Sequence, residues 1–208
     1  MSRPTKQSPE RGGARIRLLE AARDIIRSKG FAATTVDDIC SAAAVTKGAF
    51  FHNFGSKEAL GVAAAGFWEE TTSGFFAAAP YHDPADALER VLAYVAFRKA
   101  IIVGDLAEFT CLVGTMAQEI YGSHPAIRQA CAASIFGHAR TLEPDIAKAM
   151  QARRIEADWT PASLARHIQA VLQGAFILAK AKGGAAIAAD SIDHLTRYLE
   201  RLFSPEQP

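Results

Sequence analysis

The sequence lacks the features that mark secreted, membrane-spanning or disulfide-stabilised proteins. It holds three cysteines, Cys40, Cys111 and Cys131, which is no basis for a disulfide framework. No apolar run reaches the ~18–20 residues that a membrane span requires, and no secretory signal pattern opens the chain. We therefore expect a cytoplasmic protein that has no membrane partner.

Motifs for catalysis and for metal binding are missing as well. The chain has no Walker loop, no GxSxG elbow, no HExxH and no paired CxxC. His138 could be combined with His124, Glu119 or Cys131, but these spacings match no known ligand pattern. We expect no enzyme activity, no cofactor and no metal site.

Alternating strand segments are also absent, whereas helix-forming residues are abundant. Half of the 208 residues are hydrophobic, and alanine dominates among them. Alanine is the strongest helix former, and the apolar residues recur at helical spacing. The sequence therefore predicts an all-α protein of one or two domains.

The charge is small overall but unevenly distributed. The formal net charge is +1, yet residues 1–60 hold ten Lys/Arg against six Asp/Glu, and residues 61–208 hold thirteen against sixteen. This asymmetry is typical of a basic nucleic-acid-binding segment on an acidic body. Residues 1–13 are polar and rich in proline and glycine, so we expect a mobile basic arm, either a solvated tail or an arm that touches DNA.

The stretch 34–60 reads as three short helical pieces. Thr34 or Thr35 can cap a helix that runs to about residue 42, with two acids in its first turn. Thr46 caps a second helix that ends at Gly55, and Ser56 caps a third. Two short helices joined by a tight turn form a helix-turn-helix, whose second helix enters the major groove of DNA.

The second helix of this pair has the composition of a recognition helix, although an ordinary surface helix remains the alternative. Gly48 costs about 1 kcal/mol against alanine, but it lets the backbone approach a duplex closely. Phe50 and Phe54 can anchor the back of the helix. We predict phosphate contacts from the lysines, base-edge contacts from the small and polar residues, and this full set of DNA-binding residues: Thr35, Thr46, Lys47, Gly48, Ala49, Phe51, His52 and Lys57.

The same stretch resembles the DNA-binding signature of the TetR family of transcriptional regulators. The matching segments, in order, are Val36-Asp-Asp-Ile39, Ala43-Ala-Val45, Thr46-Lys-Gly48, Phe51-His52-Asn-Phe54 and Ser56-Lys-Glu-Ala-Leu60. Two positions depart from the family pattern. Ala44 stands where the family has the turn glycine, so a left-handed backbone there would cost roughly 1–2 kcal/mol. Phe51 stands where tyrosine is common, which removes a phenolic contact to phosphate.

The remaining chain predicts a helical body. We expect a helix over 14–29, with an apolar stripe that supports the two short helices. We expect a DNA-binding domain over 14–60 and an effector-binding and dimerisation domain over 61–208. The stripe consists of Ile16, Leu19, Ala22, Ile25 and Ile26. The body helices are expected at 56–79, 83–104, 109–120, 127–142 with a kinked continuation through Pro144, 161–182 and 191–203.

The last two helices are more apolar than one buried face requires. Homodimers are the commonest oligomers, and the resemblance implies that these helices pair with their copies in a second subunit to form a four-helix interface. We predict that the interface consists of Leu164, Ile168, Val171, Leu172, Ala175, Phe176, Leu195 and Leu199.

The body is also where a small molecule is expected to act. Helical bundles commonly bind ligands between their helices. The candidate effector residues are Trp68, Phe97, Cys111, Glu119 and His138. The alternative for most of these residues is a structural role, with the aromatic residues and the cysteine in the core and the acid at a solvated helix end.

The resemblance implies a homodimeric transcriptional regulator, a repressor that a small-molecule effector releases from a palindromic operator in double-stranded DNA. An alternative is a cysteine-based sensor of electrophiles or oxidants. The region around Cys111 resembles a subgroup with a Gly-Cys-Leu segment, although Thr110 replaces the glycine. No lysine or arginine lies between Asp105 and Tyr121, so the local sequence does not favour a reactive thiolate. A helical enzyme with a vestigial DNA-binding domain is a remote third possibility.

Overall fold

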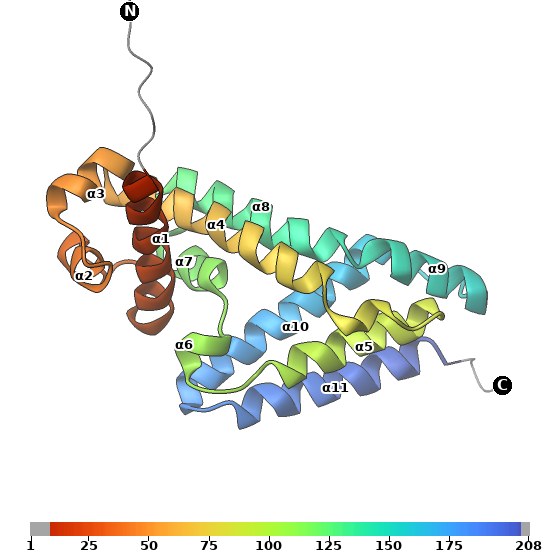
Figure 1. Cartoon of the computed structure of the whole chain (residues 1–208). Coiled ribbons are helices and arrows are strands. Elements are labelled where there is room, and N and C mark those ends of the chain that lie inside the picture. The colour runs from red at the N-terminus through yellow and green to blue at the C-terminus, as the bar shows by residue number, and fades with distance from the viewer. Residues whose placement is uncertain (1–8, 205–208) are drawn as a thin grey trace, which may run out of the picture. The chain divides into compact units, whose positions relative to one another are not determined.

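The structure, a computed structural model, describes residues 9–204, and every regular element in that range is a helix (Figure 1). This confirms the all-α prediction. Within the same range, no helix combines the length and the apolar character needed to cross a bilayer. The elements are α1 (Pro9–Lys29), α2 (Val36–Ala42), α3 (Lys47–Phe54), α4 (Lys57–Ala77), the 3-10 turn η1 (Pro80–His82), α5 (Ala87–Ala100), α6 (Leu106–Phe109), α7 (Leu112–Ile120), α8 (Pro125–Arg140), α9 (Glu143–Arg153), α10 (Pro161–Lys182) and α11 (Ala186–Leu202).

The described chain forms two compact units, and their boundary differs from the predicted division at residue 60. Unit 1 contains the described residues up to Glu70 together with Leu112–Cys131. Unit 2 contains Thr71–Cys111 and the described residues from Ala132 onward. Helices α4 and α8 each begin in unit 1 and end in unit 2. Unit 1 is therefore discontinuous in sequence, because it includes α7, which the sequence analysis assigned to the body.

The core of unit 1 is built on α1. Leu18, Ala22 and Ile26 are completely buried, one on each successive turn of this helix. The predicted stripe was wrong at Ile16, which is half-exposed, and it omitted Leu18. The 3.6-residue period allows two overlapping stripes here, and only the packing of the neighbouring helices selects between them. Fully buried side chains from those helices are Ile39, Phe50 and Leu60.

The predicted mobile arm, residues 1–13, falls mostly outside the described residues. Residues 1–8 are not described. Residues 9–13 form the first turn of α1, so the helix begins earlier than the predicted residue 14.

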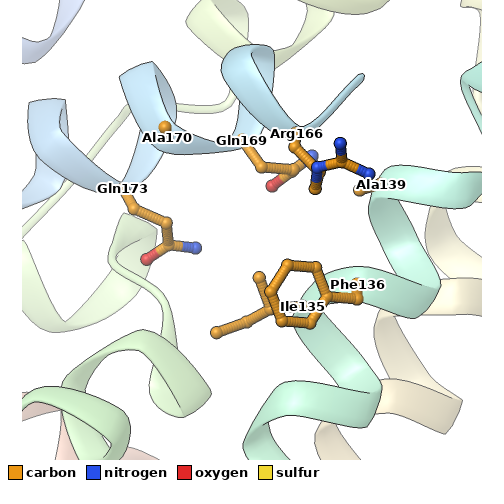
Figure 2. Close-up of a pocket in the computed structure, with 7 residues that line it drawn as sticks. All are labelled: Ile135, Phe136, Ala139, Arg166, Gln169, Ala170 and Gln173. Atoms are coloured by element: carbon orange, nitrogen blue, oxygen red, sulfur yellow. The ribbon is translucent and has the colours of Figure 1, made fainter. Parts of the chain in front are cut away.

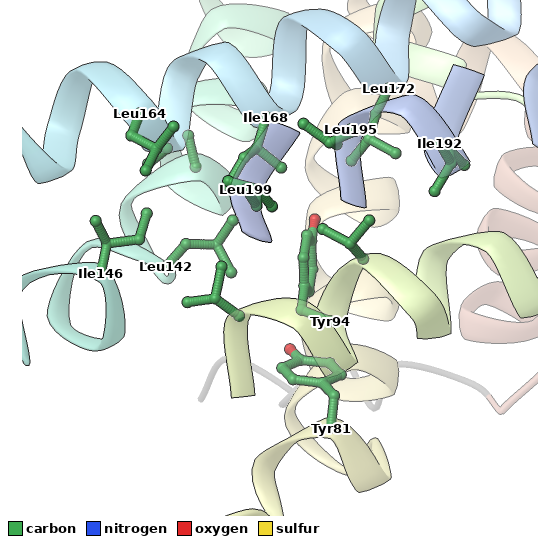
Figure 3. Close-up of a cluster of buried hydrophobic side chains, with 14 of the residues drawn as sticks. Tyr81, Tyr94, Leu142, Ile146, Leu164, Ile168, Leu172, Ile192, Leu195 and Leu199 are labelled. Atoms are coloured by element: carbon green, nitrogen blue, oxygen red, sulfur yellow. The ribbon is translucent and has the colours of Figure 1, made fainter. Parts of the chain in front are cut away.

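Unit 2 encloses a larger apolar core between α5, α9, α10 and α11. Figure 3 shows leucine and isoleucine side chains of α10 and α11 gathered around Tyr94 of α5. The long helix α10 begins at a capping box in which Thr160 and Ser163 bond each other's backbone N–H groups, with Pro161 in the first turn. It ends at Gly183, whose φ of 83° lies in the left-handed region that favours glycine.

The residues predicted to form the dimer interface lie mostly inside this core. Their exposed fractions are 0–6%, so within a single chain they are inaccessible to a second subunit, and the prediction was wrong for them. These residues are Leu164, Ile168, Leu172, Ala175, Phe176, Leu195 and Leu199, while Val171 is partly buried against the same core. The large apolar side chains that α10 and α11 do expose are Ile177, Leu178 and Tyr198, each close to half-exposed.

Several predicted body helices have different bounds in the structure, including the helix expected over 191–203, which is α11 and begins at Ala186. The helix expected over 83–104 is α5, which begins at Ala87 because the Asp86 carboxylate accepts hydrogen bonds from the N–H groups of Leu88 and Glu89. The helix expected over 109–120 is interrupted at residues 110–111, between α6 and α7. Pro144 does not kink a continuous helix but lies in the first turn of α9.

Candidate DNA-binding site and a buried polar cluster

Two side-chain caps shape the segment that carries α2 and α3. The Thr35 hydroxyl accepts a hydrogen bond from the backbone N–H of Asp38 at 3.1 Å, and the Asp38 carboxylate accepts one from the N–H of Thr35 at 2.8 Å. A hydrogen bond from Lys29 and the bonds from Thr35 hold the pKa of Asp38 well below its usual value. The Thr46 hydroxyl accepts from the N–H of Ala49 at 3.2 Å and starts α3. Both predicted N-terminal caps are confirmed.

The turn between these helices requires a left-handed residue, and that residue is Ala44. Its φ is 51°, so the turn adopts the backbone that the family's glycine would favour. The Ala44 N–H donates to the carbonyl of Ser41, and the next N–H, from Val45, donates to Cys40 at 3.0 Å. These bonds stabilise a conformation that costs an L-residue roughly 1–2 kcal/mol.

Helix α3 divides into a buried face and an exposed face. Phe50 is fully buried and Phe54 is 8% exposed, and together they anchor α3 to the core of unit 1. The opposite face is accessible, and in its first turn Lys47 is followed by the small residues Gly48 and Ala49. Six of the predicted DNA-binding residues, from α2, α3 and their caps, are exposed: Thr35, Thr46, Lys47, Gly48, Phe51 and His52; Ala49 is partly buried.

Lys47 forms an ion pair across the turn. Its Nζ lies 2.8 Å from the carboxylate of Asp37, and both side chains are exposed. Hydrogen bonding and Coulombic attraction to Asp37 raise the pKa of Lys47. A lysine predicted to contact DNA phosphate is thus paired with a carboxylate in the free protein.

Lys57 is less accessible than the sequence suggests. Its Nζ lies 4.4 Å from the centre of the Phe31 ring and 3.4 Å from the carbonyl oxygen of Ala32. Burial lowers the pKa of its ammonium group. The side chain therefore packs on the turn between α1 and α2, and a phosphate contact would have to be made from this position.

Glu119, predicted to meet an effector, forms hydrogen bonds to backbone atoms within unit 1. Its Oε2 accepts from the N–H of Phe31 at 2.6 Å and from the N–H of Ala32 at 3.2 Å. The carboxylate also lies against Gly30, whose φ is 87°, and a side chain at that position would collide with it. These contacts give Glu119 a structural role in joining α7 to the turn after α1.

The other predicted effector residues divide between the units. Trp68 belongs to unit 1, where the Arg27 guanidinium lies 5.0 Å from its ring centre. Cys111, Phe97 and His138 belong to unit 2. Phe97 stacks near three other rings, and Cys111 is partly buried against the core. None of the three cysteines forms a disulfide.

A polar cluster is enclosed in unit 2 around the hydroxyl of Tyr94. This hydroxyl accepts hydrogen bonds from Arg98 Nη1 at 2.8 Å and from Gln169 Nε2 at 3.0 Å. Both of its lone pairs are then used, so its proton goes to the Nε2 of His138, 2.8 Å away. Burial, with a smaller contribution from the Arg98 charge, lowers the pKa of His138 to about 4. His138 is therefore neutral near pH 7.

Arg98 is the member of this cluster whose burial was not predicted from the sequence. It is 7% exposed, and its Nε has no hydrogen-bond partner. Its guanidinium lies over the rings of Phe76, Tyr94 and Phe176 at 5.2–5.8 Å. A signal was present in the sequence, because Arg98 falls at helical spacing on the apolar stripe of α5 that includes Val91 and Val95.

A cavity of about 210 Å³ adjoins the cluster. Figure 2 shows Gln169 and Gln173 extending from α10 toward Ile135 and Phe136 of α8. Polar side chains thus come from one helix and apolar ones from the other. Gln169 belongs to both features, because it lines the cavity and bonds the Tyr94 hydroxyl. The full lining is Ile135, Phe136, Ala139, Arg166, Gln169, Ala170 and Gln173.

Two capped helices, a tight turn and an exposed face on the second helix define a helix-turn-helix DNA-binding protein. A family model described as "Bacterial regulatory proteins, tetR family" matches residues 18–64. Another, "Tetracyclin repressor-like, C-terminal domain", matches residues 87–195, more than half of the chain. The chain belongs to the TetR family of transcriptional regulators.

Individual relatives agree with this assignment. The HTH-type transcriptional repressor KstR2 of Rhodococcus jostii is 37% identical over 57 residues, which is 27% of this chain and 28% of that protein. The match therefore spans little more than a quarter of the curated relative.

Solved structures share the fold over nearly the whole chain. A TetR family regulator from Agrobacterium tumefaciens has a TM-score of 0.79 at 20% identity, covering 90% of this chain and 98% of that one. A regulator from Chloroflexus aurantiacus has a TM-score of 0.79 at 22% identity, covering 93% and 98%. A cysteine mutant of the regulator CifR, in a structure with 26-base-pair operator DNA, has a TM-score of 0.72 at 20% identity, covering 94% and 98%.

Proposed function

We propose that this TetR-family regulator is a homodimeric repressor that binds a roughly palindromic operator through α3 and leaves it when a small molecule binds unit 2. The observation that carries the proposal is the exposed face of α3. Its first turn offers Thr46, Lys47 and Gly48 to a ligand, while two phenylalanines hold the helix from behind. A protruding helix of this size fits the major groove. KstR2, a named repressor, and CifR, solved with its operator DNA, support this function.

The proposed dimer uses the outer faces of α10 and α11. Ile177 and Leu178 are close to half-exposed on α10, and His167 of the same helix packs on Tyr198 of α11 with ring centres 5.2 Å apart. Ala170 and Gly174 lie between them at helical spacing and allow close helix approach. A two-fold axis through this face would present two α3 helices to symmetric half-sites.

The effector is proposed to act on unit 2 because this unit holds both the cavity, which opens to the surface, and the buried polar cluster. The alternative of thiol-based sensing rests on Cys111, since Cys40 and Cys131 are buried. The variant Cys111→Ser separates these possibilities. We expect it to retain release from DNA by the small molecule, and a thiol-reactive compound that releases only the wild type would favour the cysteine instead.

The operator can be identified by selecting the full-length protein against random duplexes. We expect enrichment of a symmetric sequence, with two half-sites separated by about one helical turn. If repeated selection at moderate salt enriches no sequence, or enriches one without symmetry, the proposal is wrong.

A glycine exchange separates DNA contact from folding. The space around Gly48 accepts a Cβ, whose nearest neighbour would be the Thr46 hydroxyl at 3.8 Å. Gly48→Ala should therefore stabilise the free protein by up to about 1 kcal/mol while weakening operator binding, because the methyl group would prevent close approach to the duplex.

The matched control is Gly66→Ala in α4, where no atom lies within 4 Å of the added Cβ. It should give a similar gain in the free energy of unfolding and leave operator affinity unchanged. If fluorescence anisotropy gave the two variants equal affinity for the operator, α3 would not lie at the DNA interface.

A further inference from the structure

Unit 2 buries a positive charge that the protein does not neutralise. Arginine has a pKa above 12 and keeps its proton in any protein environment. The Arg98 partners are all neutral, namely the Tyr94 hydroxyl, the His138 imidazole and three aromatic rings. Over residues 9–204, none of the ion pairs involves Arg98. A buried charge without a counter-ion is unfavourable, which calls for an explanation outside folding.

The geometry of the guanidinium suggests what is missing. Nη1 is bound to Tyr94, whereas Nε is enclosed and has no acceptor. Carboxylates characteristically bind arginine with both oxygens on two adjacent N–H groups. The Nε of Arg98 is thus a buried donor that lacks an acceptor, and the neutral His138 beside it adds no competing charge.

The neighbouring cavity sets the size and character of the ligand. Its volume of about 210 Å³ suits a small organic molecule, and α8 contributes apolar side chains to its wall. Gln169 connects the cavity to the cluster, because its amide lines the one and donates to the Tyr94 hydroxyl of the other. Arg98 itself does not line the cavity, so an acid group would reach it only when Gln169 moves aside from the Tyr94 hydroxyl that both side chains bond.

We propose that the effector of this regulator is a small organic carboxylate, with its acid group paired to Arg98 and its apolar part in the cavity beside Gln169. The binding site stands on the structure of unit 2 alone, whereas its regulatory consequence rests on the proposed function. A neutral ligand of the same shape would leave the buried charge uncompensated and would bind more weakly.

The test uses acids and their neutral amides as matched probes on the full-length protein. Benzoate, phenylacetate and hexanoate are compared with benzamide, phenylacetamide and hexanamide at about 5 mM, with sodium chloride added to the amides to equalise ionic strength. At ten times its Kd, a ligand should raise the thermal midpoint by about 3–6 °C. We expect at least one acid, and not its amide, to raise the midpoint.

Two arginine variants locate the pairing. Arg98→Met should abolish the difference between acid and amide, whereas Arg166→Met, which removes the exposed arginine of the same cavity, should preserve it. Without ligand, Arg98→Met should melt a few degrees higher than the wild type, since an apolar side chain replaces an unpaired charge. An arginine with only a structural role would instead lower the midpoint when replaced.

Several results would overturn the carboxylate site. These are equal stabilisation by acids and amides, no stabilisation by any acid, loss of the preference in Arg166→Met alone, or a lower ligand-free midpoint in Arg98→Met. Operator binding is measured separately with the acid that stabilises best. If that acid binds through Arg98 but leaves the protein on DNA, the site is retained and the proposed effector-driven release is wrong.

Discussion

The carboxylate of Glu119 lies 2.6 Å from the backbone nitrogen of Phe31, so a residue of α7 fixes the turn that precedes the helix-turn-helix. The same oxygen accepts from the next N–H, of Ala32, at 3.2 Å. Two backbone donors that follow the end of α1 are thereby satisfied by a charged acceptor. The position of α2 depends on this turn, and through it on α7.

Replacing this acceptor should weaken unit 1. Glu119→Ala removes both bonds, and we expect a loss of about 1–2 kcal/mol in the free energy of unfolding, because the side chain is exposed and water can partly replace it. The midpoint of urea denaturation measures the effect. Glu20→Gln, a change at an exposed acid of α1, serves as control, and equal midpoints for the two variants would contradict the structural role of Glu119.

The positive φ of Ala44 predicts a gain from glycine at that position. Ala44→Gly should raise the free energy of unfolding by about 1 kcal/mol, since glycine adopts φ of 51° without the Cβ clash. The adjacent Ala43 has φ of −78° and is buried, so Ala43→Gly should destabilise the protein. Thermal unfolding of the pair should show midpoint changes of opposite sign, and a change of the same sign would argue against the left-handed turn.

The ion pair between Lys47 and Asp37 predicts that one acid limits DNA affinity. Asp37→Asn should strengthen operator binding about 3–10-fold, because it frees Lys47 for a phosphate and removes a negative charge near the duplex. Asp24→Asn, on α1, should have little effect. Anisotropy titrations over a range of salt concentrations provide the measurement, and unchanged affinity in Asp37→Asn would exclude Lys47 from the phosphate contacts.

The pKa of His138 predicts a loss of stability in mild acid. The folded protein lowers this pKa from 6.5 to about 4, so the unfolded chain binds the proton more readily between these values. Above pH 6.5 His138 is neutral in both states and does not alter the free energy of unfolding. As the pH decreases from 6.5 toward 4, this free energy falls by about 1.4 kcal/mol per pH unit, to a total loss of ~3 kcal/mol. Urea midpoints from pH 7 to pH 4.5 should flatten in His138→Gln but not in His52→Gln, a change at an exposed histidine.

The exposed faces of α10 and α11 predict two different outcomes for introduced charge. Ile177→Glu should leave the fold intact and yield a monomer in sedimentation, because the residue lies on the outer face. Leu172→Glu should instead unfold unit 2, since this side chain is completely buried and an unpaired charge there costs several kcal/mol. A wild-type protein that sediments as a monomer at micromolar concentration would refute the dimer itself.

Local chemistry explains why the DNA-binding segment was predictable. The caps Thr35 and Thr46 each precede a helix and bond a backbone N–H within it, which depends only on neighbouring residues. The left-handed turn at Ala44 was anticipated from the family pattern. The contacts of Lys57 and Glu119 were not, because their partners in residues 31–32 are distant in sequence.

Whether an apolar helix stripe faces the core or a second subunit depends on its packing partners and not on its periodicity. The most apolar stripe of α10, which includes Leu164, Ile168 and Leu172, faces the core of its own chain. The sequence alone does not distinguish such a stripe from an interface, since both are apolar and recur every three or four residues. Arg98 was overlooked for a related reason, because an arginine among apolar residues is assumed to reach solvent unless its neighbours are known.

The discontinuity of unit 1 limits how the regulator can be recombined with other proteins. A chimera that takes only residues 1–60 would carry the helix-turn-helix but omit α7 and Glu119. It would also lack both members of the close contact between Gly61 and Ile127, where a Cβ on the glycine would lie 2.7 Å from the isoleucine side chain. The DNA specificity of this protein is therefore transferable only as a non-contiguous graft, in which 112–131 accompanies the N-terminal segment.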